Sequence, residues 1–212
     1  MSLTRLSTIE NFEQNKGSAL VMVGSFAPVH EGHFDAIMSA ERAMIAKGED
    51  VSALVFAPNS DSYVSTKLKD IDGDWNFQRR VSEFMKFDFQ FKAPAFIDDI
   101  TGRNPPERSI SEKAIATIEQ RLGIQATKAL LVVGSDQLAS MKPHLEANRA
   151  ICVIRPGSIG SVMEYSNEDW FSEAVRQDRY ILTERHNRVT DISSTKIRTD
   201  LARLAMRINP SD

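Results

Sequence analysis

Short apolar runs alternate with longer amphipathic segments along most of the chain. Each run is brief and almost continuously hydrophobic, which is typical of strands in a parallel sheet that is covered on both faces. We therefore expect buried strands at 18–23, 51–57, 95–99, 128–133, 151–154 and 180–182.

Apolar residues between these runs recur at helical spacing. The expected helices cover 34–47, 75–87, 109–122 and 169–176, and Gly48 and Gly123 follow two of them, where glycine commonly ends a helix. This alternation predicts one Rossmann-like, three-layer α/β/α domain with a mostly parallel sheet and right-handed crossovers. We expect this domain to span 18–212 and to follow an N-terminal extension, 1–17, that forms a short surface helix.

Two polar stretches, 59–74 and 157–168, are expected to be loops. The first holds Tyr63 and Lys67, and a loop of this length in a small domain is more often functional than not. The helix after it is expected to turn four apolar residues inward and two arginines outward. These residues are Phe77, Val81, Phe84 and Met85 on the inner face, and Arg79 and Arg80 on the outer face.

Composition describes an ordinary globular protein, with 42% hydrophobic and 26% charged residues. The net charge of −3 favours neither a nucleic-acid partner nor a membrane surface. No segment has the length or hydrophobicity of a membrane span or a signal peptide. The single cysteine, Cys152, lies in an apolar run and is expected to be a small buried residue of a cytoplasmic protein. The sequence leaves the oligomeric state open.

The segment from Gly24 to His33, GSFAPVHEGH, lies between an expected strand and an expected helix. At such a turn, free backbone N–H groups and the helix dipole favour an anion. Gly24 and Gly32 allow close approach of the backbone, and the two histidines, His30 and His33, add imidazole donors. These features indicate a phosphate-binding turn, whereas a histidine pair alone would fit a simple helix cap equally well.

A second polar helix start follows at 191–198, DISSTKIR. Its hydroxyl groups and cations would surround free N–H groups, which suits a second anion site, although a capped surface helix has the same pattern. The residues concerned are Ser193, Ser194, Thr195 and Arg198. Between the two sites, Gly134 and Asp136 follow a strand, where Asp136 could bond a ribose hydroxyl or cap its own helix.

These motifs resemble those of a known family. The strand, the sequence Gly24-x-Phe26-x-Pro28-x-His30-x-Gly32-His33 and the helix are similar to the HxGH nucleotidyltransferases. Residues 192–198, ISSTKIR, resemble the ISSTxIR motif of nicotinamide and nicotinate mononucleotide adenylyltransferases. The loops 57–63, 132–136 and 155–157 are similar to other segments of that family.

The resemblance implies a nucleotidyltransferase domain at 18–212 that transfers adenylate from ATP to nicotinamide or nicotinate mononucleotide in NAD biosynthesis. It assigns catalysis to His30, His33 and Arg198. It assigns ATP binding to Gly24, Ser25, Phe26, Gly32, Gly134, Asp136, Ser193, Ser194 and Thr195. It assigns the acceptor to Ser25, Tyr63 and Lys67, and Mg²⁺ would arrive with ATP rather than at a protein metal site.

Two alternatives stay open at this point. Residues 100–108 contain no aromatic residue, whereas the family usually has a pyridine-stacking tryptophan there, so another phosphorylated acceptor such as phosphopantetheine fits as well. A nucleotide-binding module without catalysis is the second alternative. Retention of His30, His33 and Arg198 favours the enzyme, since binding alone would not require all three.

Overall fold

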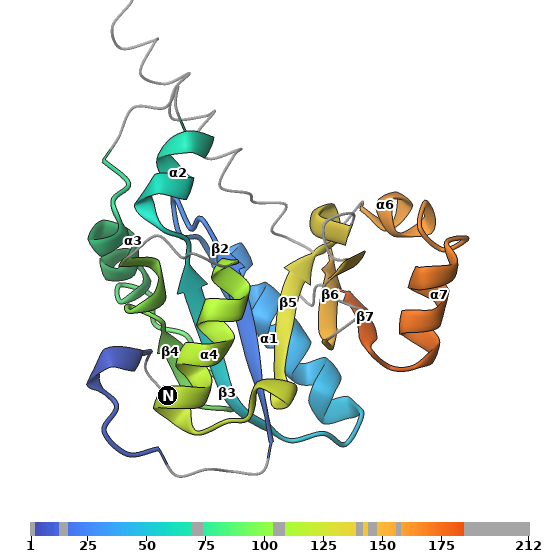
Figure 1. Ribbon diagram of the computed structural model, residues 1–212, viewed down its shortest axis with the longest axis horizontal. Helices are drawn as coiled ribbons and strands as arrows, with labels where there is room; N and C mark the ends of the chain where they lie inside the picture. Colours follow the sequence, from blue (N-terminus) through green and yellow to red (C-terminus); the bar gives the residue numbers. More distant parts are fainter. Residues whose placement is uncertain are drawn as a thin grey trace, which may run out of the picture.

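The computed structural model describes residues 3–12, 17–68, 74–103, 109–138, 142–143, 148–155 and 158–184. Within these ranges, seven strands form one parallel sheet in the order β1-β4-β3-β2-β5-β6-β7, with helices on both faces (Figure 1). This arrangement confirms the predicted Rossmann-like α/β/α fold. The strands are β1 (Thr4–Arg5), β2 (Ser18–Gly24), β3 (Val51–Pro58), β4 (Ala95–Ile97), β5 (Ala129–Gly134), β6 (Ala150–Ile154) and β7 (Tyr180–Glu184).

The helices alternate with these strands as the periodicity predicts. The α-helices are α1 (Glu31–Ala46), α2 (Asp61–Lys67), α3 (Phe77–Phe84), α4 (Ile110–Leu122), α6 (Ile159–Met163) and α7 (Asp169–Arg176). The described residues also contain the short 3₁₀ helices η1 (Leu6–Thr8), η2 (Thr101–Arg103), η3 (Ala126–Lys128) and η4 (Ser135–Gln137).

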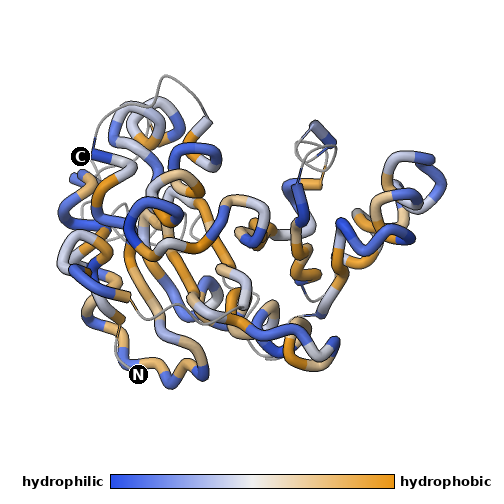
Figure 2. Tube along the Cα trace, turned by 60° about the horizontal axis from the view of Figure 1, so that its bottom comes forward, coloured by the Kyte–Doolittle hydropathy of each residue, from blue (hydrophilic) through white to orange (hydrophobic). Residues whose placement is uncertain are grey.

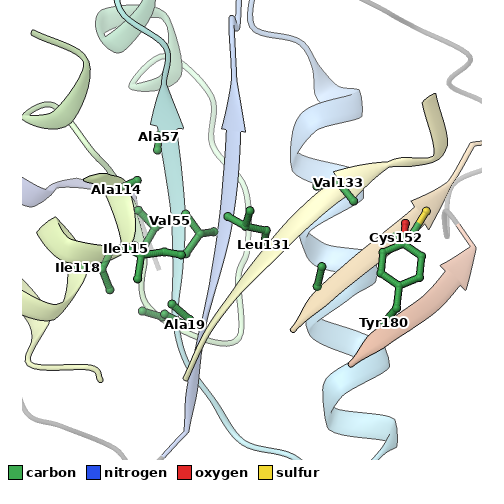
Figure 3. Packing of buried hydrophobic residues seen from close by; sticks show 14 of the residues in the cluster. Ala19, Val55, Ala57, Ala114, Ile115, Ile118, Leu131, Val133, Cys152 and Tyr180 are labelled. Atoms are coloured by element: carbon green, nitrogen blue, oxygen red, sulfur yellow. The ribbon is translucent and has the colours of Figure 1, made fainter. Parts of the chain in front are cut away.

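The strands bury both of their faces, in two separate hydrophobic clusters. On β2, Ala19 and Val21 belong to the cluster under α4 and α7, whereas Leu20 and Met22 belong to the cluster under α1 and α3. Figure 3 shows α4 side chains directed at Val55 and Leu131 of the sheet. Apolar segments accordingly gather at the centre of the molecule (Figure 2). Successive side chains on a strand point to opposite faces, so this continuous hydrophobicity requires helices on both.

The order of the strands reverses between β2 and β5. From β2 the chain builds outward through β3 and β4, and it then returns through α4 to build the other half of the sheet. The pairing of β2 with β5 ends at Val21 and Leu131. Gly24 and Gly134, at the ends of these two strands, therefore do not pair with each other. Ligands of doubly wound sheets bind in the crevice at such a reversal.

Helix ends follow local chemistry closely. Ser109 caps α4, since its Oγ accepts a 3.3 Å hydrogen bond from the Glu112 N–H, and Gly123 ends that helix with a φ of 64°. A left-handed residue after a helix is most easily glycine. The helices predicted at 109–122 and 169–176 are thus confirmed.

Three expectations about polar stretches were wrong. The 59–74 loop contains α2, because Ser60 caps it, and the 157–168 loop contains α6. The N-terminal residues form an edge strand and a 3₁₀ turn rather than only a surface helix: β1 pairs with β4, and Leu6 is fully buried. Short elements with few apolar residues leave little periodicity to detect.

In α3 the inward face is partly different from the predicted one. Phe77, Val81 and Phe84 are buried as expected, but Met85 is 43% exposed and Arg80 is completely buried. Residues 77, 80, 81 and 84 share one helical face, and Met85 lies just past the end of the helix. Arg79 is exposed, as predicted.

Cys152 is buried on β6, as expected, and Figure 3 shows its sulfur beside the hydroxyl of Tyr180. Burial raises the pKa of the thiol to about 11. Of the helices that the structure describes, none is both long and apolar enough to cross a bilayer.

Two glycines offer a matched test of packing at the carboxyl edge. A Cβ on Gly102 in η2 would lie 2.4 Å from both the Pro58 carbonyl oxygen and the Phe77 ring, whereas a Cβ on Gly160 in α6 would meet nothing within 4 Å. We expect Gly102→Ala to lower the free energy of unfolding by about 2 kcal/mol. Gly160→Ala should leave it unchanged or raise it by about 0.5 kcal/mol. Urea unfolding measures both, and equal effects would contradict the packing described here.

Candidate functional site

The segment between β2 and α1, residues 24–30, is here called the motif loop. It is anchored at its start, because the Asn59 N–H donates to the Gly24 carbonyl oxygen over 2.8 Å. Phe26 follows with a φ of 49° and is buried, and the Ala27–Pro28 peptide bond is cis. The loop ends at His30, which is the N-cap residue of α1. It therefore lies at the carboxyl end of the sheet, beside the reversal of strand order.

The two histidines of the motif form one unit. Their rings stack with centroids 3.8 Å apart and planes 26° apart. The His30 N–H donates to Nδ1 of His33 over 3.2 Å, and the His33 N–H donates to the His30 carbonyl oxygen over 3.0 Å. With Nδ1 as the acceptor, a neutral His33 must have its proton on Nε2. The bond at the helix cap therefore leaves Nε2 of His33 as the donor. A histidine pair that caps the helix and one that binds an anion thus have the same geometry here.

Phe26 supports this pair from the core. Its ring packs edge-on against His33, with centroids 4.9 Å apart, and against Phe84 of α3, with centroids 4.8 Å apart. A Cβ on Gly24 would lie 3.0 Å from the same ring, so glycine is the residue that lets Phe26 fold over the end of β2. Gly32 is buried in the first turn of α1. The glycines and Phe26 thus shape the motif loop by packing.

A cavity of about 480 Å³ opens beside the motif loop, where β2 and β5 part. The predicted acceptor residues Ser25, Tyr63 and Lys67 all line it, although they come from the loop and from α2. Gly24 also lines the cavity and leads directly into the histidine turn. The structure thus brings the expected acceptor residues together beside Gly24, whereas His30 and His33 are not among the described residues that line the cavity.

Several polar residues of the cavity wall were not assigned to the site by sequence reasoning. They are Asn59 after β3, Ser109, Ser111 and Glu112 at the start of α4, Gln137 in η4, and Asn148 before β6. All of them except Asn148, which precedes β6, follow a strand or begin α4 at the carboxyl edge of the sheet. For these residues, the position directly after a strand or at a helix cap was the available signal.

Gly134 and Asp136 lie at the end of β5, as predicted, and Asp136 makes an ion pair that sequence reasoning did not anticipate. Its carboxylate pairs with Arg155 after β6, with 3.5 Å between Oδ1 and Nη2. A Cβ on Gly134 would lie 2.4 Å from the same Oδ1, so the carboxylate folds back over the glycine. Both charged side chains are partly exposed, which leaves the pair open to a ligand.

Arg80 is the main site feature that sequence reasoning missed. Its guanidinium is fully buried and donates to the Ser25 carbonyl oxygen over 3.0 Å, to the Trp75 carbonyl oxygen over 2.8 Å and to Asp61 over 2.8 Å. Burial lowers the pKa of Arg80, and the bond to Asp61 opposes that shift. The available signal was its place on the Phe77–Val81–Phe84 face of α3.

The second predicted anion site lies outside the described residues. This applies to Ser193, Ser194, Thr195 and Arg198, and also to Pro156 and Gly157. In the part of the chain that the structure describes, no three His, Cys, Asp or Glu side chains gather as metal ligands would.

Two buried carboxylates end β4 at the same edge, and both serve the backbone. Asp98 is fully buried, and its Oδ1 accepts hydrogen bonds from the N–H groups of Ile100 and Thr101. Asp99 accepts from the N–H and hydroxyl of Ser7 and pairs with Arg103. Asp99 therefore fixes the N-terminal segment, and Asp98 starts η2.

Comparisons with known proteins add no assignment, since neither a family model nor a curated protein matches this chain. The site is therefore interpreted from its own geometry and from the motifs in its sequence.

Burial raises the pKa of Asp98 above that of an unfolded aspartate. The folded state then binds the proton more tightly than the unfolded state does, so this residue adds stability at low pH and loses it as pH rises through its raised pKa. We expect Asp98→Asn to gain stability relative to wild type at pH 7, and the gain to shrink towards pH 4.

Asp99→Asn is the control, because it disrupts charge-assisted bonds to Ser7 and Arg103 and should lose about 1–2 kcal/mol at pH 7. Urea unfolding across this pH range measures both variants. If Asp98→Asn lost as much stability at pH 7 as Asp99→Asn, the account of Asp98 would be wrong.

Proposed function

We propose that this chain transfers adenylate from ATP to a pyridine mononucleotide, nicotinamide or nicotinate, and so forms a dinucleotide and pyrophosphate. The observation that supports this most is the stacked His30–His33 pair, which begins α1 at the end of the motif loop, and Gly24 and Ser25 at the start of that loop line the cavity. It combines two imidazoles, a helix N-terminus and a glycine-containing loop at one point, which suits a polyphosphate.

The proposed reaction needs little covalent help from the protein. A phosphate oxygen of the acceptor attacks the α-phosphorus of ATP, and the bond from that phosphorus to the bridging oxygen breaks as pyrophosphate leaves. Position and charge neutralisation supply the rate in such transfers. In this proposal His33 donates from Nε2 to phosphate oxygens as charge develops on them, and His30 holds His33 in place.

The remaining ATP contacts follow from the motifs. The loop residues Gly24, Ser25 and Phe26 would lie along the phosphates, and Gly134 and Asp136 would hold the adenosine, with the Asp136–Arg155 pair at the edge of that position. Residues 193–195 and Arg198 would bind the β- and γ-phosphates, and Mg²⁺ would enter with the triphosphate. These roles rest on the family resemblance.

The acceptor would occupy the cavity. Lys67 offers a cation for its phosphate, and Tyr63, 53% exposed on α2, is the aromatic side chain of the described cavity wall. The absence of a tryptophan from that wall, as far as the structure describes it, favours phosphopantetheine or a similar compound as the second candidate acceptor. The first candidate keeps priority because the ISSTKIR motif resembles the pyridine-specific family.

The direct test is pyrophosphate release from ATP and Mg²⁺ with each acceptor in turn. We expect release with nicotinamide or nicotinate mononucleotide, and none with ATP alone. The ratio of the two rates gives the preference between amide and acid. Release only with phosphopantetheine would select the second candidate, and ATP binding without release under any acceptor would indicate a module without catalysis.

His33→Ala should lower kcat on the order of 10²-fold and leave the ATP dissociation constant within about threefold, because the contact is strongest in the transition state. His33→Gln is the matched variant, since its amide N–H can reach the position of Nε2. We expect it to recover about tenfold of the lost kcat.

Steady-state kinetics and ATP titration distinguish the outcomes. A loss of ATP affinity with unchanged kcat would contradict the proposed role of His33, as would equal kcat values for His33→Ala and His33→Gln.

A further inference from the structure

A buried arginine joins three segments that surround the candidate site. Arg80 has no exposed surface, and each of its three nitrogens makes a hydrogen bond to a different segment. The segments are the motif loop through Ser25, α2 through Asp61 and the residues just before α3 through Trp75. A guanidinium can make this three-way contact because its donors lie in one rigid plane.

The bond to the motif loop fixes a backbone orientation. Arg80 Nη1 binds the Ser25 carbonyl oxygen, and the carbonyl and N–H of a trans peptide unit point in opposite directions. The Phe26 N–H therefore points away from Arg80. Phe26, the residue after Ser25, packs on His33, so the Arg80 contact fixes the peptide unit next to a side chain that supports the histidine pair.

The bond to α2 fixes the other side of the site. Asp61 is the first residue of α2, and Tyr63 and Lys67 of the same helix line the cavity. A helix of seven residues is too short to be stable alone, so its position depends on tertiary contacts. Those contacts include the packing of Val64 in one small cluster with Ala27 of the motif loop, and the pair between Arg80 and Asp61, whose own side chain is 56% exposed.

We propose that Arg80 is a positioning residue, which holds the motif loop and α2 at the spacing that phosphate transfer between them requires. The role in the reaction rests on the proposed function above, whereas the mechanical coupling of the two segments does not. Arg80 itself reaches neither substrate, since it lies beneath the loop.

Three variants separate the two contacts. Arg80→Lys keeps the charge but loses the fork, so we expect kcat to fall about 10²-fold and the acceptor KM to rise. Asp61→Asn changes an exposed side chain and weakens only the bond to α2, so the acceptor KM should rise about tenfold with kcat nearly unchanged. Arg79→Lys is the matched control, because Arg79 is the residue next to Arg80 and its side chain is exposed. This substitution should change neither kcat nor the acceptor KM.

Hydrogen–deuterium exchange of the full chain gives a readout that needs no substrate. In Arg80→Lys, amides of both 24–30 and 60–68 should exchange faster than in wild type, whereas in Asp61→Asn only those of 60–68 should. Exchange equal to that of Arg79→Lys in both segments would overturn the coupling.

The two proposals fail differently. A wild-type protein that releases no pyrophosphate with any acceptor contradicts the proposed function, and exchange alone then decides the coupling. An active wild type whose Arg80→Lys variant exchanges faster but keeps its kcat and KM would reduce Arg80 to a structural role and overturn the positioning proposal.

Discussion

The parting of β2 from β5 is the constraint on which the site depends. These strands pair only as far as Val21 and Leu131, because the chain builds the sheet outward from them in opposite directions. The motif loop leaves β2 beside this gap, α4 begins over it, and the cavity occupies it. The helices that bury both faces of the sheet leave this edge as the place where backbone donors and a ligand can meet.

Much of this arrangement could be predicted from the sequence, because the signals are local. Strand β2 is a continuous apolar run, Gly123 ends α4 by its left-handed conformation, and the spacing of His30 and His33 fits one turn of a helix that starts between them. Each of these depends on neighbours within four residues. The motif loop was placed at the carboxyl edge of the sheet for the same reason, whereas Ser25, Tyr63 and Lys67 were assigned to the acceptor through the family resemblance.

Other features depend on partners far away in the chain. Arg80 is buried because Ser25 and Asp61 supply acceptors 55 and 19 residues away. Ser7 joins the N-terminal segment to Asp99 across 92 residues, and Asp136 finds Arg155 rather than its own helix. Charged residues are usually exposed, so the sequence alone does not show that a particular one, such as Arg80, is buried in the core.

In the proposed reaction, one dinucleotide would span the gap, with its phosphates at the histidine turn and its pyridine half in the cavity. A crystal structure of the chain with the dinucleotide product bound tests this most directly. The account predicts phosphate oxygens within hydrogen-bond distance of His33 Nε2 and the pyridine nucleotide among Ser25, Tyr63 and Lys67. A dinucleotide bound elsewhere, or one whose phosphates lie away from both histidines, would contradict it.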